Sequence, residues 1–463
     1  MVKRTFAEQF DALADSFRPV SLRAWEIREK FKCNLLMRQY RYFSSELMLI
    51  VLVFSAIFAL GQPQAATLEG DEAHPVQIII GPKPNIGPKP NIDPQPNINE
   101  IAIAHPPALF TSKVEGAITY DTVLYQGYHS LQGLTKGYTN EKGFRRARLS
   151  VSGALNGVWE YDINLNFVDA INLVGKGATG QVFRPTYAIT YSGFSNVEIA
   201  GGQLSEPFSL ESATSSSDTT FMERGLPNAF SPTSNLGIRI SATPAKEFYL
   251  QVGGYKEDHN NLNNLKQSIT GRVAYAPINT KSWTQHFGTM VSHRLLNDNR
   301  QRFRARAESS LTPAWFTTGT IKDVDKVVLS GFETATVWGS ASLQAEYERA
   351  SISNDDTDQK QLIDGYYVFA SWFLTGESRP YKEGSFDSIK PNNDGGAWEV
   401  AVRKSAINNK INRGEKMRDI TLGLNWYINK KARLMMNYVY ATHKKESVYG
   451  NARIYQIRGQ IEF

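Results

Sequence analysis

Alternation of apolar and polar residues is the dominant pattern of the chain from about residue 109 to its end. In WEYDINLNF (159–167) every odd position is apolar or aromatic and every even position is polar. The same period of two recurs in AWEVAVRK (397–404), DITLGLNWY (419–427), RLMMNYVYAT (433–442) and YQIRGQIEF (455–463). A period of two is typical of β-strands with one apolar and one polar face. The pattern therefore predicts an all-β domain over residues 109–463.

The placement of aromatic residues favours a transmembrane barrel over a soluble β-sandwich. Trp and Tyr crowd the ends of the predicted strands, as in the girdles of membrane barrels, and the opposite strand face carries charged and amide side chains. Because lipid offers no hydrogen-bond partner to an open sheet edge, such a sheet has to close. At about 22 residues for each strand with its connection, residues 109–463 predict an antiparallel β-barrel of about 16 strands around an aqueous channel.

The chain before residue 67 predicts export. LMLIVLVFSAIFAL (47–60) is a 14-residue apolar run that follows Arg38 and Arg41 and precedes the small residues Ala65 and Ala66. This is the arrangement of a cleaved secretory signal, and an uncleaved signal anchor is the alternative. We expect residues 1–66 to be an atypical leader plus signal peptide, with translation starting at Met1 or at Met37.

Residues 67–108 predict a Pro-rich periplasmic linker. GPKPNIGPKPNIDPQPNI (81–98) contains three hexapeptide repeats with proline at the second and fourth positions. Because each proline fixes φ and lacks an N–H group, the segment favours an extended polyproline II spacer. Docking to a periplasmic partner is the alternative role.

Composition narrows the function classes. The formal net charge of +6 on 463 residues is modest, and no nucleic-acid-binding motif accompanies it. The only cysteine, Cys33, precedes the predicted cleavage site, so the mature chain would contain no disulfide. These features agree with export and exclude a disulfide-stabilised scaffold.

Several segments resemble the phosphate-selective porin O and P family. They are FRRARLSVSGALNGVWEYDINLNF (144–167), GQLSEPFSLESATSSSDTTFMER (202–224), RFRARAESSLT (302–312), LTGESRPYKEGSFDSIKP (374–391) and LGLNWYINKKARLMMNYVYA (422–441). The resemblance extends over residues 109–463. It implies a homotrimeric, 16-stranded, anion-conducting porin in the outer membrane of a Gram-negative bacterium, with a long third loop, residues 206–235, folded inward as a constriction.

A row of arginines is the first candidate anion path. RQRFRAR places Arg300, Arg302, Arg304 and Arg306 at alternate positions, hence on one face of a strand or hairpin rim. Facing a water-filled lumen, each guanidinium keeps its hydration and offers forked donors to a passing anion. Weak multi-site binding of this kind lets an ion both enter and leave. A basic extracellular loop that contacts lipopolysaccharide phosphates is the alternative.

The family resemblance adds a second group of arginines and three departures. Arg145 and Arg146 match paired arginines near the constriction, and Arg148 is added where phosphate-specific members have tyrosine. Ser212 replaces a lysine inside the constriction loop, Ser205 a tyrosine before it, and Glu160 a lysine after the Trp of strand three. These departures argue against a dedicated phosphate site and leave a general anion preference, with acidic residues as opposing charges: Glu160, Asp162 and Glu206.

The sequence thus predicts a channel for passive diffusion of small anions, with phosphate and polyphosphate as candidate solutes and with neither catalysis nor cofactor. The alternatives are an unselective general porin, an outer-membrane barrel enzyme and a secreted β-adhesin. GKGATG (175–180) lacks the helix that a phosphate loop needs, and the serines at 215–217 lack a nucleophile elbow. The histidines show no paired metal-ligand spacing.

Overall fold

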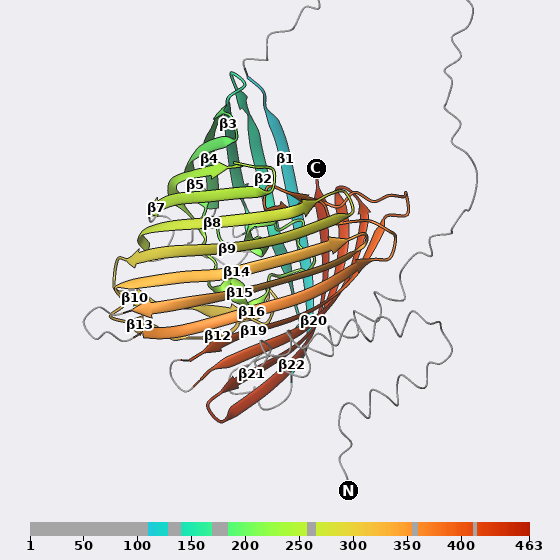
Figure 1. Ribbon diagram of the computed structural model, residues 1–463. Helices are drawn as coiled ribbons and strands as arrows, with labels where there is room; N and C mark the ends of the chain where they lie inside the picture. Colours follow the sequence, from blue (N-terminus) through green and yellow to red (C-terminus); the bar gives the residue numbers. More distant parts are fainter. Residues whose placement is uncertain (1–109, 128–139, 169–183, 257–264, 354–359, 411–413) are drawn as a thin grey trace, which may run out of the picture. The chain divides into compact units, whose positions relative to one another are not determined.

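Sixteen strands close into one antiparallel barrel, as the alternation predicted (Figure 1). The structure is a computed structural model that describes residues 110–127, 140–168, 184–256, 265–353, 360–410 and 414–463. Every barrel strand pairs with its neighbour in the chain, and the last strand pairs with the first from Ala117↔Glu462 to Gly127↔Ala452. The predicted leader, signal peptide and linker lie outside the described residues.

The barrel strands run in chain order around the wall. They are β1 (Lys113–Gly127), β2 (Glu141–Leu155), β3 (Trp159–Asn166), β4 (Arg184–Phe194), β5 (Val197–Ser205), β6 (Ser234–Ala242), β7 (Phe248–Lys256), β8 (Leu265–Asn279), β9 (Trp283–Leu296), β14 (Lys326–Trp338), β15 (Ala341–Ser353), β16 (Lys360–Phe373), β19 (Ala397–Asn409), β20 (Lys416–Asn429), β21 (Ala432–Lys445) and β22 (Val448–Glu462). In the described part of the chain no helix has the length and apolarity needed to cross a membrane.

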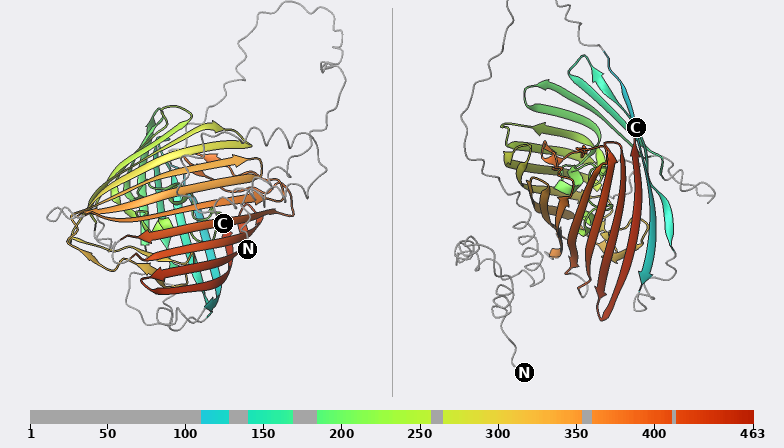
Figure 2. Two further views of the ribbon diagram at one scale, coloured as in Figure 1. Left: turned by 60° about the horizontal axis from the view of Figure 1, so that its bottom comes forward. Right: turned by 90° about the vertical axis from the view of Figure 1, so that its right-hand side faces the viewer.

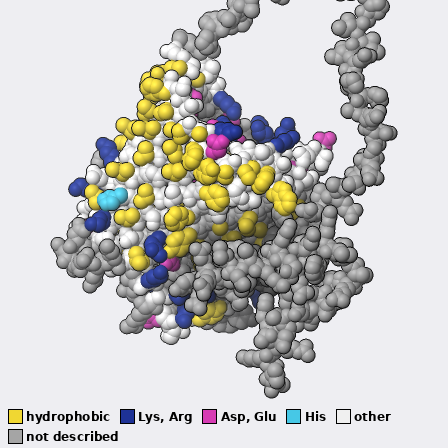
Figure 3. Space-filling view, viewed as in Figure 1, with side chains coloured by type: hydrophobic (Ala, Val, Ile, Leu, Met, Phe, Trp, Pro, Cys, Tyr) yellow, Lys and Arg dark blue, Asp and Glu magenta, His cyan; other side chains and the backbone are white. Residues whose placement is uncertain are grey.

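Alternation puts polar side chains inside the barrel and apolar ones outside. On β22, Gln456 and Arg458 are buried in the interior, whereas Tyr455 and Ile457 are exposed on the outer wall. Figure 3 shows hydrophobic side chains spread over the outer face of the strands. This inside-out arrangement suits a wall between lipid and an aqueous lumen.

The two ends of the barrel differ in their connections. At one end, most strands are joined by a few residues, such as Asn156 and Gly157, whose φ angles of 51° and 70° belong to the Asn-Gly hairpins that fit twisted strands. At the other end the connections are mostly longer. Short turns at one end and longer loops at the other are typical of transmembrane β-barrels.

Tryptophans mark the short-turn end as a membrane interface. Trp398 of β19 stacks on Trp426 of β20 with ring centroids 5.4 Å apart, and Trp159 of β3 lies 4.8 Å from Tyr191 of β4. Trp283 and Trp338 are directly opposed in the β9–β14 pair. Large amphipathic rings at one level of a barrel form the girdle that the sequence predicted.

Three connections fold into the barrel interior. Loop L3 (206–233) joins β5 to β6 and contains α5 (Leu210–Ala213) and η3 (Leu226–Ala229). Loop L5 (297–325) joins β9 to β14 and contains the short strands β10 (Arg300–Gln301), β11 (Arg304–Arg306), β12 (Ala314–Thr317) and β13 (Ile321–Lys322). Turn T6 (374–396) joins β16 to β19 and contains β17 (Tyr381–Lys382) and β18 (Ser385–Phe386). Figure 2 shows the green segment of L3 within the ring of strands, which confirms the predicted inward-folded third loop.

L5 packs as an apolar layer inside the loop-side half of the barrel. Its buried side chains Phe303, Trp315 and Phe316 belong to one cluster with inward-facing Val439 and Ile454 of the wall. These wall positions break the polar-inside rule because they face L5 instead of water.

We predict that Leu422→Arg, on the outer face of β20, lowers the free energy of unfolding by about 2–4 kcal/mol, because an arginine at mid-strand has to enter lipid. The measurement is urea-dependent folding into lipid vesicles, monitored by mobility in detergent gels. Leu422→Met is the matched control and should change little. A loss below about 1 kcal/mol for Leu422→Arg would show that this face does not contact lipid.

Candidate functional site

A β-bulge on β2 directs a group of arginines at loop L3. Thr119 pairs with Arg146 and Tyr120 with Phe144, so that Arg145 is the extra residue of the bulge. Arg145 donates to both carboxylate oxygens of Glu223 in L3, over 2.7 and 3.0 Å. The sequence-predicted FRRAR motif therefore faces the inserted loop.

Within the described residues Arg146 and Arg148 form no ion pair, although Glu223 is near enough to Arg146 to attract it electrostatically. Arg146 is only 7% exposed, and among the described residues no acceptor lies within hydrogen-bond distance of its Nη1. Arg148 is exposed and donates from Nη1 to Ser216 Oγ of L3 over 3.2 Å. Arg224 of L3 is near enough to Arg148 to interact with it electrostatically. Burying a guanidinium that has an unused donor lowers the stability of the fold unless an anion binds to it.

Glu223 balances only part of this charge. It also accepts from Arg458 of β22 over 2.7 Å, and Arg458 is bound in turn by Asp121 of β1 over 2.7 Å. Burial alone would raise the pKa of Glu223, but the ion pairs with Arg145 and Arg458 outweigh it and hold the pKa well below its usual range. Four guanidinium groups face two carboxylates here, which leaves a net positive charge on Arg145, Arg146, Arg148, Arg458, Asp121 and Glu223.

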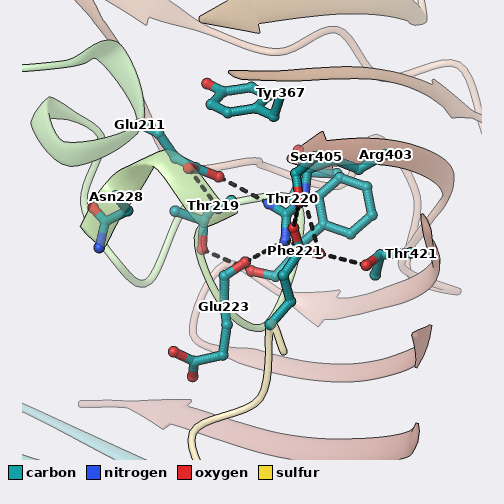
Figure 4. Close-up of polar contacts among 12 residues, drawn as sticks. Glu211, Thr219, Thr220, Phe221, Glu223, Asn228, Tyr367, Arg403, Ser405 and Thr421 are labelled. Carbon is teal, nitrogen blue, oxygen red and sulfur yellow. Dashed lines mark hydrogen bonds and ion pairs between the residues drawn. The ribbon is translucent and has the colours of Figure 1, made fainter. Parts of the chain in front are cut away.

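Arg403 of β19 joins L3 to L5 (Figure 4). Its Nη1 lies 2.9 Å from Glu211 Oε1 of L3 and its Nη2 donates to the backbone oxygen of Glu223 over 2.7 Å. The same Nη2 atom also lies 2.6 Å from Glu308 Oε2 of L5. The guanidinium also stacks on Phe221, 4.3 Å from the ring centroid. One buried side chain of the wall thus holds both inserted loops.

Glu308 is the anchor of L5. Its carboxylate accepts from Arg403, from Ser405 of β19 and from Thr421 of β20, and its backbone has a φ of 41°, a region that residues other than glycine rarely adopt. Its backbone oxygen accepts from Gln456 of β22 over 2.9 Å. Strained backbone of this kind persists where surrounding contacts determine it.

The predicted arginine row lies on L5, in β10, β11 and the residues between them, and not in a barrel strand. Phe303 and Ala305 are buried between Arg302, Arg304 and Arg306, which are exposed, so the alternation separates an apolar face from a cationic one. Arg300, in β10, is exposed as well. Arg306 Nη1 donates to the backbone oxygens of Ser310 and Thr312.

The three predicted constriction-loop residues have structural partners. Ser205 ends β5, and its Oγ lies 3.0 Å from Ser234 Oγ of β6. Glu206 is buried, with Oε2 2.8 Å from Arg294 Nη1 and Oε1 accepting from Asn235, so its charge is neutralised at the root of L3. Ser212 Oγ donates to Asn228 Oδ1 over 3.0 Å within L3.

T6 meets L3 from the short-turn end. Phe386 N donates to Thr214 Oγ1 over 3.4 Å, and Arg379 lies 3.7 Å from the Phe386 ring centroid. Tyr381 Oη lies 2.6 Å from Nδ1 of the buried His286 in β9. Two connections from opposite ends of the barrel therefore touch inside it.

The inserted segments cover one side of the lumen and leave the other side accessible to solvent. Inward side chains on β8–β22 are mostly buried, such as Arg272, Glu346 and Asn425. Inward side chains near the short-turn end of β3 and β5 stay exposed or half-buried, such as Glu160 and Glu198, whereas Ala200 and Leu204 further along β5 are buried. The solvent-accessible part of the lumen therefore follows the short-turn half of β1–β5, up to Arg148.

The competing motifs do not form a reactive site in the described residues. Ser215–Ser217 lie in L3, where Arg433 donates to the Ser217 backbone oxygen over 3.3 Å. Within the described ranges no three His, Cys, Asp or Glu side chains converge as metal ligands. The GKGATG segment at 175–180 lies outside these ranges.

Sequence reasoning missed the residues that hold the loops, namely Arg403, Arg458, Glu211, Glu223 and Glu308. One feature of the sequence could have indicated that such residues exist. Apolar residues at predicted lumen positions, such as Val439 and Ala441, indicate that something other than water covers that part of the wall. The partners themselves are 95 or more residues apart and leave no local pattern.

We predict that Glu308→Gln loosens L5, because Arg403 loses one of two carboxylates. Weakening a charged hydrogen bond by about 1.5–3 kcal/mol raises the population of opened loop roughly tenfold to hundredfold. Tryptic cleavage after Arg302 or Arg304, followed by mass spectrometry, should accelerate accordingly. Asp323→Asn in the same loop is the control, and equal cleavage of the two variants would contradict the anchoring role.

We predict a pH-dependent gain of stability from Asp218→Asn in L3. Burial, and then the nearby Glu462, raise the pKa of Asp218 to about 6. The folded protein therefore holds this proton more tightly than the unfolded chain, and ionisation above pH 6 costs stability. Asp218→Asn should raise the melting temperature above pH 6 and leave it unchanged below pH 4. An equal effect at both pH values would refute the role of charge.

Comparisons with known proteins agree with the barrel fold. A sequence model of the family "Phosphate-selective porin O and P" matches residues 113–463. Porin O of Pseudomonas aeruginosa is 28% identical over 376 residues, 73% of this chain and 84% of that protein. An uncharacterized protein of Caulobacter vibrioides is 27% identical over 312 residues, 63% of this chain and 59% of that protein.

One solved structure supports the fold alone. The loop L8 deletion mutant of OmpT, an outer membrane protein of Vibrio cholerae, superposes with a TM-score of 0.50 at 13% identity, covering 77% of this chain and all of that one. The family match spans most of the chain and indicates a channel rather than an enzyme. The chain belongs to the phosphate-selective porin O and P family and is a porin of the Gram-negative outer membrane.

Proposed function

We propose that small anions diffuse passively through the lumen and interact with Arg145, Arg146 and Arg148 beside L3. The observation that carries this proposal is the unused Nη1 of Arg146, buried among further guanidinium groups. A mobile anion supplies the missing acceptor and leaves again, because it is not held by a full set of partners. Phosphate is one candidate solute.

The arginine row of L5 extends the same path in this proposal. Arg300, Arg302, Arg304 and Arg306 would collect anions at the loop end before the constriction, whose walls would include Ser205 at the end of β5 and Glu206 and Ser212 of L3. The exposure of Arg302 and Arg304 next to buried apolar residues supports this role. Contact with lipopolysaccharide phosphates is the competing role of the row.

Export and assembly complete the proposal. Residues 1–66 would direct secretion and residues 67–108 would serve as a periplasmic spacer, which N-terminal sequencing of the mature protein tests. A homotrimer is supported by an apolar hollow on the outer wall of β2–β4, lined by Ile163, Tyr187 and Ile189. A monomeric mass from light scattering in detergent would refute the trimer.

We predict that the double variant Arg146→Gln/Arg148→Gln lowers the anion-to-cation permeability ratio of the channel by a factor of about three or more, because two of the local positive charges disappear. The measurement is the zero-current potential in a potassium chloride gradient across a planar bilayer. Arg418→Gln, on the outer face of β20, removes one arginine outside the lumen and should change nothing. A companion variant, Arg302→Gln/Arg304→Gln/Arg306→Gln, should also lower the preference.

Cation preference in the unaltered protein, or no response to either arginine variant, would contradict the proposed function. No response to the L5 variant alone would instead place the row outside the permeation path and favour its lipopolysaccharide role.

A further inference from the structure

A group of carboxylates lines the accessible side of the lumen near the short-turn end. Glu160 and Asp162 lie on the inward face of β3, and Glu198 lies on the inward face of β5. Glu160 and Glu198 are exposed, and Asp162 is half-buried. Glu160 is close enough to Glu198 to repel it electrostatically. We call these three residues the carboxylate belt.

The charge of the carboxylate belt is not neutralised. In the described part of the chain none of the three residues forms an ion pair. Two nearby lysines are paired elsewhere, Lys113 with Glu115 and Lys382 with Glu383. Arg239 and Lys382 are the cations that act electrostatically on Glu198, and Arg239 also donates to the Ser205 backbone oxygen. The belt therefore has a net negative charge even with Arg239 included.

The carboxylate belt and the arginines lie in series on one wall. Arg148 of β2 pairs with Asn166 of β3, and six residues further along β2, Ala154 pairs with Glu160. At about 3.3 Å per residue, the two charge groups are separated by about 20 Å along the strands. Because both face the accessible side of the lumen, an anion that leaves the arginines toward the short-turn end meets the carboxylates.

We propose that the carboxylate belt selects anions of low charge, so that this porin passes monovalent anions in preference to divalent ones such as the hydrogen phosphate ion, HPO₄²⁻. This inference rests on the proposed anion path. A divalent anion interacts twice as strongly as a monovalent one with each fixed charge. It is therefore held more strongly at the arginines and repelled more strongly at the belt, and its passage is slowed on both counts.

The test compares phosphate and chloride permeability in planar bilayers at pH 8, where most phosphate is divalent, for the full-length protein and for Glu160→Gln/Asp162→Asn/Glu198→Gln. Removing three charges should raise the phosphate-to-chloride permeability ratio roughly threefold or more, since the repulsion falls more for the divalent ion. It should also reduce any asymmetry of current with voltage polarity. Glu141→Gln, at the loop end of β2, is the matched control and should leave the ratio unchanged.

The single variants Glu160→Gln and Glu198→Gln, each checked for heat-modifiable mobility, give smaller shifts in the same direction and keep the test usable if the triple variant does not fold. An unchanged ratio, in channels whose anion preference still falls with Arg146→Gln/Arg148→Gln, overturns the role of the belt and leaves the proposed function standing. A channel that responds to neither set of variants overturns both.

Discussion

The hydrogen-bonded seam between β1 and β22 is the constraint on which the rest of the structure depends. In lipid an unpaired backbone N–H or C=O group costs several kcal/mol, so a sheet can cross only as a closed ring. The seam runs from Ala117↔Glu462 to Gly127↔Ala452, and Phe463 adds backbone hydrogen bonds to Gly116. Closure then gives the lumen and the lipid face opposite polarity on every strand.

Inside the closed wall, the inserted loops fill part of the lumen and leave the rest open as a channel. Apolar contacts hold L5 in the loop-side half, whereas charged contacts hold L3 deeper inside, with Arg403 bound to Glu211 and Glu308. Breaking one partner of such a buried pair leaves an uncompensated charge, which makes these contacts specific for one arrangement of both loops. The shape of the pore is therefore decided by ion pairs between the wall and its inserted segments.

Charge then changes sign along the accessible wall. The arginines of β2 exceed their acidic partners beside L3, whereas Glu160 and Glu198 leave the short-turn end negative. A pore with both signs in series discriminates by the charge of the solute as well as by its sign. In this view, Glu160 matters more to selectivity than Glu206, whose carboxylate is buried against Arg294.

The sequence by itself determined the closed barrel and its strand number, because a period of two and interfacial aromatics are local patterns that repeat along the chain. The inward third loop was implied by the resemblance to the porin family and by no local pattern. It also identified FRRAR and Glu160 as charged lumen positions. Only the tertiary structure decided that Arg145 is paired with Glu223 while Arg146 keeps an unused donor, and that RQRFRAR belongs to an inserted loop. Ion pairs form between residues distant in the chain, and their geometry exists only after the wall has closed around the loops.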